Sequence, residues 1–124
     1  MKTELRREEP GARWEPYLRE FNRQNGARLT RLGVMKSDGG VEDLWLEDGL
    51  QLSGIDLDTE GDEAPSVEIM LGGEGASGRN VTRTVVRARK VVIRLDAEGR
   101  GEGLDIEDSA GATTVLRFET RSTE

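Results

Sequence analysis

The sequence predicts an α+β fold: an N-terminal amphipathic helix packed on a six- to seven-stranded, mostly antiparallel curved sheet or small barrel. Three observations lead to this prediction. The length of 124 residues suits one domain, so we expect residues 1–124 to form a single unit. A helical spacing of aromatic residues occurs near the N-terminus. Short alternating apolar runs, separated by Gly and Asp, fill the rest of the chain.

The predicted helix covers about residues 12–25. Its apolar stripe, spaced by three and four residues, consists of Trp14, Tyr17, Leu18 and Phe21. Pro16 falls in the first turn, where its missing N–H removes no helical hydrogen bond, and Asn25-Gly26 predicts a left-handed stop. The preceding residues 1–9 are strongly charged, so we expect them to be flexible.

Residues 27–119 are predicted to be β-rich, and residues 120–124 to be a flexible tail. Strands are expected around positions 27–36, 41–47, 67–71, 81–86, 91–95, 104–106 and 116–118. Asp48-Gly49 is typical of a hairpin, but a two-residue turn there would place Leu44 and Leu50 on opposite faces. A bulge or a broader bend is therefore needed. The longer loops are expected at 56–66, 72–79 and 97–103.

The composition excludes most common catalytic sites. The chain has no His and no Cys, the side chains most used for transition-metal binding and for nucleophilic or near-neutral acid/base chemistry. Residues 73–78 match the nucleotide-binding pattern G-x-G-x-x-G, but a β-branched run follows where that motif needs a helix. We therefore expect a protein that is not an enzyme and has no cofactor.

Charge is segmented along the chain, within a net charge of −7. Residues 37–78 carry twelve Asp and Glu and no Lys or Arg, whereas residues 79–94 carry six Lys and Arg and no acid. In one interpretation, cross-strand ion pairs neutralise the basic segment. In the other, one face stays open and docks an acidic partner or a second copy. The candidate partner-binding residues are Arg83, Arg87, Arg89 and Arg94. Nucleic acid is not expected as a partner, because the isoelectric point is about 4.8.

An acidic segment supports the alternative function. Asp56, Asp58 and Glu60, followed by Gly61, resemble the opening of a calcium-binding loop. The twelfth position holds Val67 instead of the bidentate carboxylate that such a loop requires. The alternative is therefore a weak divalent-ion or small-ligand-binding module that uses the acidic 56–63 loop.

The apolar spacing and turn residues also resemble those of a known family. The matching segments are Trp14-x-x-Tyr17-Leu18-x-x-Phe21, Asn25-Gly26, Leu52-x-Gly54-Ile55 and the stretch from Leu104 to Gly111. Together they are similar to a family of small uncharacterised bacterial proteins, a domain of unknown function with an N-terminal helix followed by a β-meander. The resemblance runs from about Arg7 to Phe118. It implies the same α+β domain and transfers no catalytic or binding residue. Members often have a His in the stretch where Asn25 stands, and this chain has none.

The sequence also bears on location. The N-terminus is charged and no apolar stretch follows it, which predicts neither a signal peptide nor a membrane association. We therefore expect a cytoplasmic interaction domain.

Overall fold

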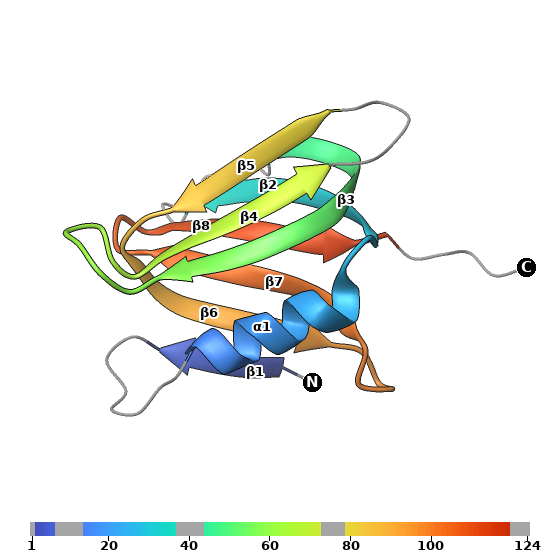
Figure 1. Ribbon diagram of the computed structural model, residues 1–124, viewed down its shortest axis with the longest axis horizontal. Helices are drawn as coiled ribbons and strands as arrows, with labels where there is room; N and C mark the ends of the chain where they lie inside the picture. Colours follow the sequence, from blue (N-terminus) through green and yellow to red (C-terminus); the bar gives the residue numbers. More distant parts are fainter. Residues whose placement is uncertain (1, 7–13, 37–43, 73–78, 120–124) are drawn as a thin grey trace, which may run out of the picture.

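The computed structural model describes residues 2–6, 14–36, 44–72 and 79–119, and shows one helix and eight strands in this part of the chain (Figure 1). In chain order these are β1 (Lys2–Arg6), α1 (Trp14–Asn25), β2 (Leu29–Lys36), β3 (Leu44–Asp58), β4 (Ser66–Gly72), β5 (Asn80–Val85), β6 (Ala88–Leu95), β7 (Gly101–Asp108) and β8 (Ala112–Phe118). The G-x-G-x-x-G segment and the 120–124 tail lie outside the described residues.

All strands join one antiparallel sheet in the order β1-β6-β7-β8-β2-β3-β4-β5. Two meanders, β2 to β5 and β6 to β8, meet where β8 pairs with β2. In the described residues, one helix with a mostly antiparallel sheet confirms the α+β class. The sheet has edges at β1 and β5 and is not closed, so the small barrel is wrong. The described strands number eight, not six to seven. Figure 1 shows α1 lying across the concave side of the curved sheet.

Strand β3 bends the sheet. Its first part pairs with β2 and its second part with β4. Thr30 is opposite Leu50, but Arg31 is opposite Asp48, which leaves Gly49 as an extra residue with φ of 98°. Asp48-Gly49 is therefore a bulge within one 15-residue strand and not a hairpin turn. Bulges increase local twist, which lets β3 continue from one part of the sheet to the other.

The first strand corrects the expectation that residues 1–9 are flexible. Lys2–Arg6 forms β1, which pairs with β6 from Lys2 opposite Arg94 to Arg6 opposite Lys90. Leu5 is buried in the core, while the charged residues on either side of it are exposed. A single apolar residue in a charged segment carries no readable periodicity, so only the tertiary pairing identifies this strand.

The end of the helix also differs from the prediction. The left-handed residue is Ala27, with φ of 71°, and Gly26 has no positive φ. The Ala27 N–H donates to the Leu52 carbonyl (2.8 Å), and the Leu52 N–H donates to the Arg28 carbonyl (2.9 Å). This pairing with β3 fixes the chain reversal one residue later than the Asn25-Gly26 pattern predicts.

The core lies between the concave face of the sheet and α1. Trp14, Leu18 and Phe21 are buried, as the helical spacing predicts, and the Phe21 ring stacks on Phe118 with centroids 5.7 Å apart. Tyr17 belongs to the same predicted stripe but is 48% exposed. The sheet contributes a set of fully buried aliphatic side chains, which includes Leu32, Leu52, Ile69, Leu71, Leu104, Ile106 and Leu116.

Candidate functional site

The structure separates the four candidate arginines. Arg83 lies on β5 directly opposite Ile69, which is fully buried, so its side chain is on the core side of the sheet. Its Nε donates to the Thr114 hydroxyl on β8 (3.2 Å), and Thr114 is itself 1% exposed. Arg83 thus links β5 to β8 inside the fold and is poorly placed to contact a partner.

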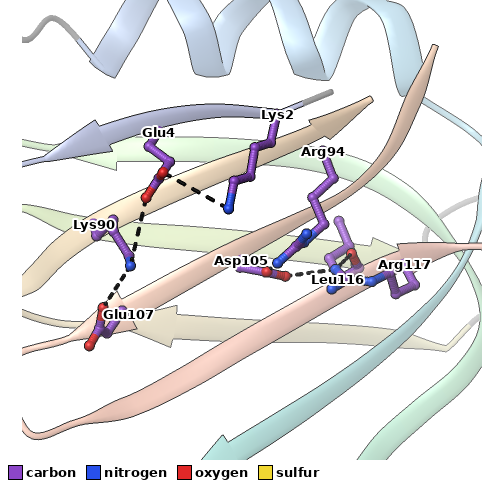
Figure 2. Close-up of polar contacts among 8 residues, drawn as sticks. All are labelled: Lys2, Glu4, Lys90, Arg94, Asp105, Glu107, Leu116 and Arg117. Carbon is purple, nitrogen blue, oxygen red and sulfur yellow. Dashed lines mark hydrogen bonds and ion pairs between the residues drawn. The ribbon is translucent and has the colours of Figure 1, made fainter. Parts of the chain in front are cut away.

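Arg94 belongs to an ion-pair network on the convex side of the sheet (Figure 2). Its Nε donates to Asp105 Oδ2 (2.7 Å), and Arg117 Nη1 donates to Asp105 Oδ1 (2.7 Å). The Asp105 side chain is only 11% exposed, so one carboxylate ties β6 to β7 and β8. Lys90, also on β6, extends this network: its Nζ lies 3.5 Å from Glu107 Oε1 and 3.8 Å from Glu4 Oε1.

Arg87 and Arg89 differ from the other two. Both are exposed, and the described part of the chain offers neither side chain an ion pair. Arg87 occupies the short connection between β5 and β6 with φ of 51°. Its N–H donates to the Glu63 carbonyl (2.8 Å), and its carbonyl accepts from the Ser109 N–H (3.0 Å). We call these two residues the arginine corner.

The acidic 56–63 loop lies beside the arginine corner. Figure 1 shows the β3–β4 turn, the β5–β6 connection and the β7–β8 turn at the same end of the molecule. Asp56 and Asp58 belong to the end of β3 and not to a loop, and both are exposed together with Glu60. Asp58 Oδ1 accepts a hydrogen bond from the Glu60 N–H (3.0 Å), which folds the turn. Among the residues that the structure describes, no group of three acidic side chains could hold a metal ion.

Sequence reasoning missed the role of Arg28, which was not among the four candidate arginines. Its Nη1 donates to Asn25 Oδ1 (2.7 Å) and to the Gly101 carbonyl (2.8 Å), and its guanidinium lies 4.1 Å from the centre of the Phe118 ring. Burial lowers the pKa of Arg28, and the nearby charge of Arg100 lowers it further. These contacts connect the end of α1 to β7, which gives Arg28 a structural role. Its position directly after a helix stop gave no indication of this.

Sequence reasoning also missed a groove of about 340 Å³ between α1, β1 and β6. Its lining residues are Thr3, Pro16, Tyr17, Glu20, Phe21, Gln24, Asn25, Ile93 and Leu95. The exposure of Tyr17 is explained by this groove, because its ring lines the wall instead of entering the core. The helical stripe made Tyr17 look like a core residue, so the sequence alone did not reveal the site.

Comparisons with protein-family models, with curated proteins and with solved structures found no match. The resemblance to a bacterial family of unknown function therefore stays a prediction. In the described segments, no helix is long and apolar enough to span a lipid bilayer.

Proposed function

We propose that this chain is a small non-enzymatic interaction domain that docks an acidic surface through the arginine corner, Arg87 and Arg89. The observation that carries the proposal is the contrast within the basic segment. Arg83 and Arg94 are engaged by contacts with other strands, whereas Arg87 and Arg89 are exposed without an ion pair in the described residues. Arginine suits such a role, because its planar guanidinium binds carboxylates through two parallel hydrogen bonds.

The backbone at the corner supports the proposal. Arg87 has a positive φ, which is unfavourable for a residue with a side chain. Hydrogen bonds to Glu63 and Ser109, and a third from the Ala88 N–H to the Pro65 carbonyl (2.8 Å), hold this conformation. A fixed backbone reduces the entropy that a partner must remove on binding.

The acidic turn beside the corner favours one partner, a second copy of this chain. The Arg87 N–H donates to the Glu63 carbonyl, and Asp62, Glu63 and Arg87 are all exposed, so positive and negative charges adjoin at this end of the molecule. Under a two-fold axis such a surface is complementary to itself, because each corner faces the other copy's acidic turn. Charges beyond a Debye length of about 8 Å are screened, so the net charge of −7 does not prevent this contact.

The test is a charge exchange followed by sedimentation equilibrium at low and high salt. Wild-type protein is expected to dimerise in a salt-dependent manner, and Arg87→Glu with Arg89→Glu is expected to be monomeric. A second variant, Asp62→Arg with Glu63→Arg, is expected to be monomeric alone and to form a heterodimer with the first. The matched control, Arg19→Glu with Arg23→Glu, makes the same charge change on exposed ion-paired helix residues and is expected to leave association unchanged.

Failure of the exchange would exclude the second copy and leave an acidic protein as the partner. In that case the wild-type chain, the corner variant (Arg87→Glu with Arg89→Glu) and the helix control are used to capture proteins from the source organism. A protein retained by the wild type and the helix control, and lost with the corner variant, is the partner. Equal capture by all three would refute the proposed site.

The alternative function, weak divalent-ion or small-ligand binding at Asp56, Asp58 and Glu60, has less support. These carboxylates form no metal-binding group in the described residues, and Asp58 is already used within its own turn. A rise in melting temperature with millimolar calcium or magnesium, lost in Asp58→Asn, would favour it over the interaction proposal.

A further inference from the structure

The groove between α1, β1 and β6 is large enough for a small molecule. Its volume of about 340 Å³ lies within the range of small-ligand sites. Phe21 and Ile93 are nearly fully buried beneath it, and Leu95 extends the apolar floor. The helical residues that line it run from Pro16 to Asn25, a rise of about 13 Å along the helix axis. An apolar body of about six to eight carbons fits this length.

The polar groups of the groove select the charge of its ligand. Among the described residues that line the groove, Glu20 alone carries a charge at neutral pH, and it is negative. Tyr17 lies in the same wall and is largely exposed, whereas the Phe21 ring stacks on Phe118 beneath it. A carboxylate beside aromatic rings attracts a cation, since the faces of aromatic rings carry negative potential. The net charge of −7 also raises the local concentration of small cations.

We infer that this groove binds a small organic cation, with an ammonium group between Glu20 and Tyr17 and an apolar body along Phe21, Ile93 and Leu95. The site is distinct from the arginine corner, which lies at the far end of β6. It also uses chemistry of the opposite sign. A carboxylate ligand of the same size would meet Glu20 and be repelled, and a neutral one would gain only the apolar contact.

Two neighbours compete with the ligand for Glu20. Arg23 donates from Nε to Glu20 Oε1 (3.0 Å) and from Nη2 to Oε2, and Gln24 Nε2 also donates to Oε2 (2.7 Å). The Arg23 hydrogen bond lowers the pKa of Glu20, so its carboxylate is ionised at neutral pH. The Arg23 and Glu20 side chains are 70% and 50% exposed, and such surface pairs are weak enough for a bound ammonium to displace them.

This competition gives variants with opposite effects. Glu20→Gln keeps the shape of the groove and removes the charge, so the affinity for an organic cation should fall about threefold. Arg23→Gln removes the competitor, so the affinity should rise about twofold. Tyr17→Leu keeps an apolar wall without the ring and should weaken binding about threefold. Glu15→Gln is the matched control, because Glu15 pairs with Arg19 on the same helix but does not line the groove.

The experiment is a titration of the ¹⁵N-labelled chain with hexylammonium, hexanol and hexanoate, followed by amide chemical shifts. Hexylammonium is expected to bind in the millimolar range, to shift amides at Tyr17, Phe21 and Leu95, and to bind about fivefold more tightly than hexanol. Circular dichroism confirms that each variant is folded, and the arginine corner double variant should bind hexylammonium as the wild type does.

Three results would overturn the inference: no saturable shift of groove amides at tens of millimolar hexylammonium, equal affinity for hexanol or hexanoate, or equal affinity of the wild type and Glu20→Gln. Loss of dimerisation with intact hexylammonium binding would refute the interaction site alone. The two proposals therefore fail independently.

Discussion

The ion-pair network around Asp105 allows a quantitative test of the fold. Asp105→Asn keeps the size of the side chain but removes the charge that Arg94 and Arg117 share (Figure 2). The asparagine has one acceptor oxygen, so one of the two hydrogen bonds is lost and the other becomes weaker. Hydrogen bonds to charged groups contribute about 1.5–3 kcal/mol each.

The exposure of the arginines limits this loss. The Arg94 and Arg117 side chains are 39% and 32% exposed, so each can turn toward water when the carboxylate is gone. The Asp105 position itself is 11% exposed, and the amide that replaces it stays buried. We therefore expect Asp105→Asn to lower the free energy of unfolding by about 2 kcal/mol, below the 3–5 kcal/mol typical of a fully buried pair.

Urea unfolding, followed by circular dichroism, measures this difference. The control is Glu107→Gln, because Glu107 lies on the same strand and pairs with Lys90 at the looser distance of 3.5 Å. It should lower the free energy of unfolding by less than about 1 kcal/mol. A double-mutant cycle with Arg117→Gln should give a coupling energy of about 1 kcal/mol. If Asp105→Asn destabilises no more than Glu107→Gln, the carboxylate does not connect these strands and the reasoning is wrong.

Four further substitutions test details of the structure. Ala27→Gly should raise the free energy of unfolding by about 0.5 kcal/mol in urea, because glycine relieves the positive φ. Gly26→Ala should not lower it, because the added Cβ meets the Asn22 carbonyl oxygen at an ordinary 3.4 Å, whereas a left-handed Gly26 would predict a loss of about 1 kcal/mol. Gly103→Ala should lower the melting temperature through a loss of about 3 kcal/mol, because its Cβ would lie 2.3 Å from a backbone carbonyl oxygen. The pKa of Asp96 is lowered, chiefly by a hydrogen bond from the backbone N–H of Arg100. Its contribution to stability is therefore lost as the pH falls from the unfolded-state pKa through the folded-state pKa. Asp96→Asn should reduce this loss of stability at low pH, which urea unfolding at a series of pH values measures.

Local patterns in the sequence were sufficient for most of the fold. The alternation of Val67, Ile69 and Leu71 predicts β4, and that of Val91 and Ile93 predicts β6, because each strand buries one face. The errors arise where pairing partners decide the outcome. The first strand depends on β6, and Gly49 is a bulge because β2 continues to pair on both sides of it. Neither partner is visible in the local sequence.

The candidate site was only partly predictable for the same reason. Arg83 lies two residues from both Val81 and Val85, and alternate residues of a strand share a face, so this spacing indicates a side chain on the core side. The same rule fails for Arg89, which lies two residues before the buried Val91 but is exposed. A register shift between Ala88 and Lys90 changes its face. The rule is reliable only in regular strands, so the arginine corner could not be separated from its neighbours by sequence.

Strand order also explains how the segmented charges are used. The basic residues of β6 find acids on β1 and β7, its two neighbours in the sheet, and not in the acidic 37–78 segment that precedes them in the chain. The acidic turn before β4 is therefore left without cations from β6, and the tight β5–β6 connection places it beside Arg87. Adjacent surfaces of opposite charge are what a self-complementary contact requires. Ion pairs within the described residues account for Arg79, Lys90 and Arg94 of the basic segment. The charge-exchange experiment tests whether Arg87 and Arg89 instead serve association at the arginine corner.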